Sequence, residues 1–412
     1  MKYGCIGEHL KHSFSKEIHN ALADYEYEIR EIPGESLDAF MRAKDFLAIN
    51  VTIPYKELVM PYMDYIDGHA QEIGSVNTVV NRDGRLYGYN TDFYGMSSLI
   101  EHAKIEIKDK KVVILGTGGT SKTARAVSKT LLAKEIITVS RKAREGCITY
   151  GELYRNHSDA EVIINTTPVG MFPNIFDSPV DISGFNNLVG VIDAVYNPLR
   201  TPLILAAKEK EISAEGGLYM LVKQAVRASE IFIETKYSEE EADLVFKKIK
   251  REKENIVLIG MPASGKSSVG KALAKRLNMQ FIDTDDIITL RAKKPISRIF
   301  EEDGEEYFRA LETEVIKECS SMTGAVISTG GGAVLNKNNV SALRENGRLY
   351  FLDRPLEELM PTSDRPLAST REAIKKRYEE RYEIYRASAD EIIDTGCTVE
   401  ATADKIERSF CE

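Results

Sequence analysis

One stretch of the sequence could bind a nucleoside triphosphate. Gly260–Ser267 fits the pattern G-x-x-x-x-G-K-[ST] at every fixed position. An apolar run, 256–259, precedes it and predicts a buried strand, and apolar residues at helical spacing follow it. The backbone N–H groups of such a loop would surround phosphates, Lys266 would reach the β and γ oxygens, and Ser267 would hold Mg²⁺. A glycine-rich turn that only packs is the alternative, and the correct flanks on both sides argue against it.

A second glycine-rich turn could bind a dinucleotide. Gly116–Ser121 follows the apolar run 112–115 and opens a predicted helix, which makes it a shortened form of the dinucleotide fingerprint. The next predicted strand, 136–139, ends in Ser140-Arg141-Lys142, where an NAD-preferring site would place an acidic residue. Because two cations suit a 2′-phosphate, the sequence predicts NADP rather than NAD. A solvated basic turn is the alternative.

Short strands alternate with helices along the chain, which predicts an α/β fold. Strands are expected at 2–6, 27–32, 48–51, 76–80, 112–115, 136–139, 162–164, 188–192 and 256–259. Helices are expected at 16–25, 218–236 and 239–253, with 251–254 as the junction between two enzymes. Polar loops follow the strands at 165–168 and 193–198, where folds of this kind bind ligands.

Composition limits the possible functions. A chain of 412 residues is expected to form two or three domains, and 43% hydrophobic with 29% charged residues describes an ordinary globular protein. The net charge of −9 argues against nucleic-acid or acidic-membrane partners. The five cysteines are scattered, which suggests a reducing compartment and no cysteine metal site. With no secretory pattern and no long apolar run, a cytoplasmic enzyme is predicted.

Several further stretches occur in a characteristic order over residues 1–250. They are His12–Ser15, Asn50–Lys56, Ser75–Thr78, Asn90–Asp92, Asn165–Met171, Tyr196–Pro198 and Gly217–Gln224. In these stretches the chain resembles shikimate dehydrogenase. The resemblance implies a substrate-binding domain at 1–100, completed by helices near 218–250, and a Rossmann NADP-binding domain at 101–217.

The same resemblance implies the roles of individual residues. Lys56 and Asp92 would be the catalytic pair. The substrate carboxylate and hydroxyls would be held by Ser13, Ser15, Thr52, Asn77, Tyr196 and Gln224. The residues expected at NADP are Gly116, Gly118, Gly119, Arg141, Lys142 and Gly217.

The chemistry of ketone reduction agrees with this pair, because a lysine held by a carboxylate can protonate the alkoxide that hydride addition leaves. The alternatives are a surface lysine for Lys56, a helix N-cap for Asp92, and a simple turn for Ser13 and Ser15. Two positions depart from the family pattern. Lys16 follows the paired serines where proline is usual, and Ser140-Arg141-Lys142 stands where Asn-Arg-Thr is usual.

The rest of the chain carries a second ordered set of stretches. They are Gly260–Ser267, Phe281–Asp286, Gly304–Arg309, Ser328–Gly332, Asp364–Leu367 and Arg381–Tyr385. Over residues 255–412 the chain resembles shikimate kinase, which implies a P-loop kinase domain with a parallel sheet. Lys266 and Asp285 would be the catalytic residues, and Asp285 would form a hydrogen bond with the attacking hydroxyl. Asp283 would help Ser267 hold Mg²⁺. The expected substrate-binding residues are Arg309, Gly331, Gly332 and Arg381. Those expected at ATP are Gly260, Ser264, Gly265, Ser267 and the lid residue Arg365.

Two of these residues could have other roles. Arg309 could form a surface ion pair with Glu305 or Glu312 at helical spacing, and Asp285 could cap the following helix. Before the lid, Met360-Pro361 replaces an arginine that the family places against adenine.

The two resemblances together imply consecutive reactions on one molecule. NADPH would reduce 3-dehydroshikimate to shikimate, and ATP with Mg²⁺ would phosphorylate shikimate to its 3-phosphate. One alternative is a quinate-preferring dehydrogenase using NAD. Another is a C-terminal half that only senses nucleotide and regulates the first, and a third is a structural scaffold for other enzymes. The sequence does not determine the oligomeric state.

Overall fold

The computed structural model describes residues 1–8, 10, 14–360, 370–396 and 398–411. These residues divide into two compact units, Met1–Ile249 and Lys250–Glu412. The boundary falls inside helix α9 (Glu239–Lys253). Residues 251–253 of the predicted junction are therefore the last turn of a helix and not a separate linker. Across the described ranges, no helix has the length and apolar content needed to cross a membrane.

The first sheet of unit Met1–Ile249 is mixed. Its strands are β1 (Tyr3–Gly7), β2 (Tyr27–Glu31), β3 (Ala48–Val51), β4 (Tyr65–Ile66), β5 (Thr78–Arg82) and β6 (Arg85–Tyr89). They lie in the order β2-β1-β3-β5-β6-β4, with β5 antiparallel to both β3 and β6. Asp83 and Gly84 join β5 to β6 with positive φ angles of 50° and 82°, a geometry typical of a two-residue hairpin turn. The strands expected from the sequence do not include β6.

The second sheet of the same unit is parallel throughout. Its strands are β7 (Lys111–Leu115), β8 (Glu135–Ser140), β9 (Ile148–Thr149), β10 (Val162–Asn165), β11 (Gly190–Asp193) and β12 (Ser213–Glu215). Their order is β12-β11-β10-β7-β8-β9. Alternate residues of β7 enter two different hydrophobic clusters, Val113 and Leu115 on one face and Val112 and Ile114 on the other. A parallel sheet buried on both faces confirms the predicted Rossmann fold and brings the loops after β7, β8 and β10 to one edge.

Unit Lys250–Glu412 contains a third, parallel sheet. Its strands are β13 (Asn255–Ile259), β14 (Gln280–Asp283), β15 (Ala325–Ser328), β16 (Gly347–Asp353) and β17 (Glu391–Asp394). They lie in the order β14-β15-β13-β16-β17, so the strand before the phosphate loop is central. Ile256 and Leu258 pack on one face of this sheet, and Val257 and Ile259 pack on the other. The parallel sheet confirms the predicted P-loop fold.

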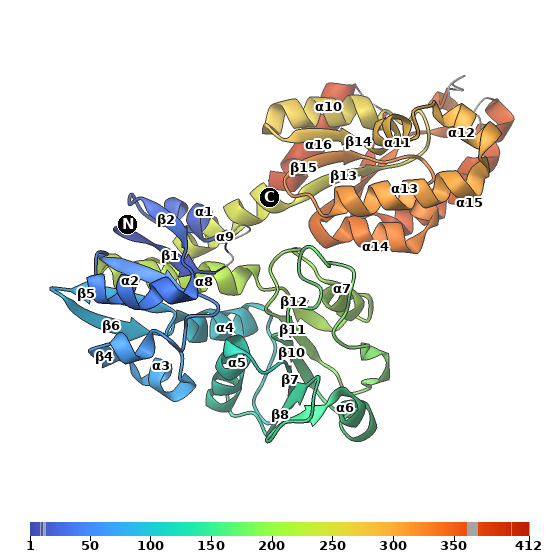
Figure 1. Ribbon diagram of the computed structural model, residues 1–412. Coiled ribbons are helices and arrows are strands. Elements are labelled where there is room, and N and C mark those ends of the chain that lie inside the picture. The colour runs from blue at the N-terminus through green and yellow to red at the C-terminus, as the bar shows by residue number, and fades with distance from the viewer. Residues whose placement is uncertain (9, 11–13, 361–369, 397, 412) are drawn as a thin grey trace. The chain divides into compact units, whose positions relative to one another are not determined.

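Helices cover these sheets (Figure 1). In the first unit, before α9, they are α1 (Ser15–Leu22), α2 (Leu37–Ala43), α3 (Gly68–Ile73), α4 (Thr91–His102), α5 (Gly119–Thr130), α6 (Tyr150–Asn156), α7 (Pro202–Glu209) and α8 (Leu218–Ile233). In the second they are α10 (Lys266–Leu277), α11 (Thr284–Ala292), α12 (Ile296–Glu302), α13 (Gly304–Ser320), α14 (Lys337–Asn346), α15 (Arg371–Ser388) and α16 (Val399–Cys411). Helices α10 and α16 cover one face of the third sheet, and α13, α14 and α15 cover the other.

Candidate active sites

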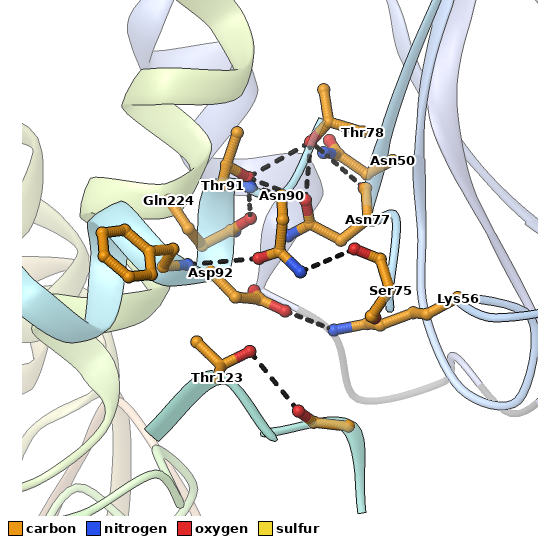
Figure 2. Close-up of polar contacts among 12 residues, drawn as sticks. Asn50, Lys56, Ser75, Asn77, Thr78, Asn90, Thr91, Asp92, Thr123 and Gln224 are labelled. Atoms are coloured by element: carbon orange, nitrogen blue, oxygen red, sulfur yellow. Dashed lines mark hydrogen bonds and ion pairs between the residues drawn. The ribbon is translucent and has the colours of Figure 1, made fainter. Parts of the chain in front are cut away.

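Lys56 and Asp92 form an ion pair in the first unit. The Lys56 Nζ lies 2.6 Å from the Asp92 Oδ2, although the two residues are far apart in sequence (Figure 2). Lys56 follows β3, and Asp92 lies in the first turn of α4. The side chains are 16% and 11% exposed. A short charge-assisted bond therefore holds an ammonium group that is still partly open to a substrate, as proton donation requires.

The N-cap of α4 is a different residue. The Asn90 Oδ1 accepts a hydrogen bond from the Phe93 N–H at 3.2 Å, and the Asn90 Nδ2 donates to the Ser75 carbonyl at 2.8 Å. The alternative that Asp92 caps this helix is therefore wrong. Because Asn90 performs that task, the Asp92 carboxylate is left to hold Lys56.

A buried polar network lies beside this ion pair. The Asn77 Oδ1 accepts from the Thr91 N–H at 2.7 Å, and the Thr91 Oγ1 lies 3.4 Å from the Gln224 Oε1. Asn77 is 3% exposed and Gln224 8% exposed. The network joins the start of β5, α4 and α8, so it brings two of the predicted substrate residues to one place with Lys56 and Asp92 (Figure 2).

The other predicted substrate residues lie on separate segments. Thr52 directly follows β3, and Ser15 is the first residue of α1. Tyr196 packs edge-on against Phe14 with ring centroids 5.2 Å apart, and burial raises its pKa to about 12. Ser13 lies outside the described residues.

The glycine-rich turn after β7 has the geometry of an anion-binding loop. Gly116 has a φ of 109°, and a side chain there would collide with Thr166. Gly118 and Gly119 open α5, and a Cβ at either would meet no atom within 4 Å. Backbone N–H groups at a helix N-terminus can therefore face a phosphate there.

One of the cations that follow β8 contacts this loop. Arg141 and Lys142 are exposed. Arg144, which sequence reasoning missed, donates from Nη1 to the Thr117 Oγ1 of the glycine-rich turn at 3.0 Å. The sequence could have indicated Arg144, because it is the third cation within five residues of the strand end.

Gly217 has a packing reason to be glycine, since its Cβ would lie 2.2 Å from the Ala194 carbonyl oxygen.

A buried carboxylate ties together the loops that follow β10 and β11. The Asp193 Oδ1 accepts from the Asn165 Nδ2 and the Val195 N–H, each at 2.9 Å, and its Oδ2 accepts from the Thr201 Oγ1 at 2.7 Å. Asp193 is fully buried. Burial raises its pKa from 3.8 to about 7, against the lowering effect of these three donors.

We expect this group to make the stability of the first unit depend on pH. Because its pKa is higher in the folded than in the unfolded chain, the free energy of unfolding should fall as pH rises from about 4 to about 7. Asp193→Asn keeps the shape and cannot ionise, and its amide can donate to the Thr201 hydroxyl instead. Relative to wild type, the variant should gain stability as pH rises from about 4 to about 7, measured by urea unfolding. Asp177→Asn, at an exposed position, is the control, and parallel pH profiles for Asp193→Asn and wild type would refute the assignment.

The second unit contains a cavity of about 330 Å³ beside the phosphate loop. The loop contributes Pro262 and Ser267 to its lining. The predicted charged residues Asp283, Asp285, Arg309 and Arg381 line it too, as do Gly331 and Gly332. The structure therefore brings the predicted acceptor-binding residues to one cavity.

The phosphate loop has the backbone that its motif predicts. Gly260 and Gly265 have φ angles of 147° and 93°, which favour glycine. Lys266 is 5% exposed, and its Nζ donates to the carbonyls of Gly260 and Met261, each at 2.9 Å. Ser264 is buried within the loop.

Hard oxygen donors lie together at the start of α10. The Ser267 Oγ donates to the Asp283 Oδ2 at 2.7 Å. A hydroxyl and one carboxylate fit Mg²⁺, which in nucleotide sites takes few protein ligands and fills its shell with phosphate and water. Among the described residues there is no cluster of three His, Cys, Asp or Glu side chains that could hold a metal by itself.

Asp283 also caps α11, because its Oδ1 accepts from the Asp285 N–H at 3.1 Å. The alternative that Asp285 caps this helix is therefore wrong. Asp285 instead lines the cavity, where its carboxylate lies against Gly330 and a Cβ at that glycine would approach within 2.7 Å.

The guanidinium groups of the cavity are held in place by other residues. Arg309 forms ion pairs with Glu305 at 3.1 Å and with Glu312 at 2.7 Å, as helical spacing predicted, but the Glu312 side chain is only 2% exposed, so that pair does not lie on the surface. Arg309 nevertheless lines the cavity, and a Cβ at Gly332 would lie 2.1 Å from its Nη1. Arg381 donates from Nη1 to the Gly331 carbonyl at 3.1 Å. Sequence reasoning missed the cavity residues Glu312 and Arg377 as site residues, and Arg365 lies outside the described residues.

The fold and the two sites define the chain as an α/β enzyme of the nucleotide-dependent class. One sheet carries a dinucleotide-type glycine-rich turn, and another carries a triphosphate loop beside a charged cavity.

Comparison with known proteins gives the families. The family described as shikimate dehydrogenase substrate binding domain matches residues 5–79, and the family described as shikimate kinase matches residues 262–410. A shikimate dehydrogenase (NADP(+)) of Clostridium beijerinckii is 40% identical over 56% of this chain and 92% of its own length. The chain therefore belongs to the shikimate dehydrogenase family, and its C-terminal residues 262–410 match the shikimate kinase family in addition.

Solved structures agree for the first unit. Shikimate dehydrogenase 1 of Peptoclostridium difficile has a TM-score of 0.56 and 36% identity, covering 60% of this chain and 98% of its own. A shikimate 5-dehydrogenase of Thermus thermophilus, solved with NADP(H) and shikimate, has a TM-score of 0.54 and 25% identity over 60% of this chain and 99% of its own.

Proposed function

We propose that this chain catalyses two consecutive reactions, reduction of 3-dehydroshikimate to shikimate and phosphorylation of shikimate to shikimate 3-phosphate. The observation that carries the proposal is the presence of a shikimate kinase domain on a chain of the shikimate dehydrogenase family. The product of the first reaction is the acceptor of the second. We assign substrate binding to residues 1–100 with the helices near 218–250, NADP binding to 101–217, and kinase activity to 255–412.

In the first reaction the Lys56 ammonium donates the proton that the reduced ketone oxygen takes up. Asp92 orients the ammonium through their 2.6 Å contact and can accept a bond from a substrate hydroxyl. Ser13, Ser15, Thr52, Asn77, Tyr196 and Gln224 would hold the remaining polar groups of the substrate. NADPH, when bound, supplies the hydride.

In the second reaction the residues of the cavity position the acceptor. Arg309 and Arg381 bind its carboxylate, and the Asp285 carboxylate accepts the proton of the attacking hydroxyl. Lys266 stabilises the charge of the transferring phosphoryl group, and Ser267 with Asp283 would hold Mg²⁺. ATP, when bound with Mg²⁺, supplies the phosphoryl group.

One coupled reaction tests the proposal. Purified chain receives 3-dehydroshikimate, NADPH, ATP and Mg²⁺, and product is followed by mass spectrometry. Shikimate 3-phosphate should accumulate, and leaving out ATP should stop the reaction at shikimate. NADPH oxidation without any phosphorylated product would instead support a C-terminal half that only senses nucleotide. Faster turnover of quinate with NAD would support the other alternative.

Arg141 is the proposed partner of the 2′-phosphate of NADPH. Arg141→Ala should raise the KM for NADPH about tenfold to a hundredfold, because charge-assisted bonds to phosphate are worth roughly 1.5–3 kcal/mol. The KM for NADH, which lacks this phosphate, should change little. Arg155→Ala removes an exposed cation from the same unit and serves as the control. Equal losses with the two cofactors would remove the 2′-phosphate role.

A further inference from the structure

A third arginine lines the kinase cavity beside the two that the family resemblance predicts. Arg377 and Arg381 lie one helical turn apart on α15, and Arg309 comes from α13. Two guanidinium groups already match one planar carboxylate. The third therefore needs a separate explanation.

The three arginines differ in how their charge is balanced. Arg309 has the two ion pairs described above, and Arg381 is 8% exposed and bonded to the Gly331 carbonyl. Arg377 donates from Nη1 to the Ala373 carbonyl of its own helix at 3.2 Å, and its buried Nε has no hydrogen-bond partner among the residues that the structure describes. Within the part of the chain that the structure describes, no carboxylate pairs with Arg377. Arg377 therefore keeps most of its donors for a ligand, as Arg381 does, whereas Arg309 already donates three hydrogen bonds to carboxylates.

Without an anionic ligand, the charge of Arg377 is in an unfavourable environment. Burial, and then the neighbouring charge of Arg381, lower the pKa of Arg377, while the charges of Glu380 and Glu305 oppose this shift only in part. A partly buried cation that lacks a partner costs free energy until an anion arrives. The positive charge of Arg377 on α15 therefore favours binding of an anionic ligand.

The cavity also has oppositely charged groups on different elements. Asp283, Asp285 and Asp286 come from the end of β14 and the start of α11, whereas the arginines come from α13 and α15. An acceptor with one carboxylate and several hydroxyls would be oriented by these charges. Its carboxylate would face α15, and a hydroxyl would face the aspartates.

We propose that Arg377 is a specificity residue of the kinase site, a third guanidinium that binds the carboxylate of the acceptor and makes the site select anionic acceptors. A carboxylate has lone pairs enough for several donors, so it can accept from Arg377 in addition to Arg309 and Arg381. The inference rests on the proposed kinase function and adds a residue to its substrate recognition.

The test compares Arg377→Met with Lys376→Met in the full chain. Like arginine, methionine has an unbranched side chain and a high helix propensity, so the substitution should not disturb α15. Lys376 is 78% exposed on the same helix, so its variant removes the same charge away from the cavity. Kinase rates are measured with ATP saturating, nicotinamide cofactor absent, and shikimate or its methyl ester as acceptor.

Arg377→Met should raise the KM for shikimate about tenfold to a hundredfold with kcat changed less than about threefold, because a ground-state contact is lost. The KM for the uncharged ester should barely change, Lys376→Met should behave as wild type, and Arg377→Lys should lie between. An unchanged KM for shikimate, equal losses for acid and ester, or a loss confined to kcat would overturn the inference. A wild-type chain that phosphorylates neither acceptor would contradict the proposed function itself.

Discussion

Lys56→Ala should lower the rate of 3-dehydroshikimate reduction by about a thousandfold and leave phosphorylation of shikimate unchanged. General acid catalysis contributes roughly a hundredfold to ten-thousandfold, and the loss of the ammonium also removes its stabilisation of the developing alkoxide. Alanine further leaves Asp92, 11% exposed, without the cation that lies 2.6 Å from it. The two rates are measured separately, one by NADPH oxidation and the other by ATP consumption with shikimate.

The control for this variant is Lys122→Ala. Lys122 forms an exposed ion pair with Glu57 at 2.6 Å, so its loss removes a charge from the same unit without touching the pair at Lys56. Exposed pairs contribute little, and we expect full activity in both assays. If Lys56→Ala reduced its substrate at the rate of this control, the assigned proton donor would be wrong.

Lys266→Ala should have the converse effect, a loss of about a thousandfold or more in phosphorylation with reduction intact. Phosphoryl transfer depends mostly on positioning and on neutralising the charge of the transferring group. Lys266 is the buried cation of the phosphate loop, and its bonds to the Gly260 and Met261 carbonyls also order that loop. The variant therefore loses both the charge and part of the support of the loop.

Lys275→Ala is the matched control, because Lys275 is exposed on the same helix α10. It should retain both activities. Circular dichroism on each variant checks that the chain is folded. If Lys56→Ala or Lys266→Ala silenced both reactions in a folded chain, the assignment of one reaction to each unit would fail.

The sequence predicted a helix or strand well where its hydrophobic pattern covers the same residues as its backbone hydrogen bonds. The apolar run Ala48–Val51 is β3, and the amphipathic stretch Glu239–Lys253 is α9, each at the predicted bounds. The predicted strands 76–80 and 188–192 begin two residues before β5 and β11, because Val76 and Leu188 are buried without belonging to the ladder. Apolar character reports burial, whereas strand bounds are set by hydrogen bonds to a neighbouring strand. Strand β6 was not predicted for a related reason. It is a strand because it forms hydrogen bonds with β5, and the local sequence pattern does not report such a partner.

The sequence by itself determined the two nucleotide loops and their chemistry, because Gly116–Ser121 and Gly260–Ser267 are contiguous and each loop's own backbone makes the anion site. Only the tertiary structure decided which side chains work together across distance. It paired Lys56 with Asp92, made Asn90 the N-cap of α4, and placed Arg377 in one cavity with Arg381, where no carboxylate of the described residues forms an ion pair with Arg377. The reason is physical: a side chain's partner depends on which elements pack together, and sequence spacing fixes that only within a single helix or turn.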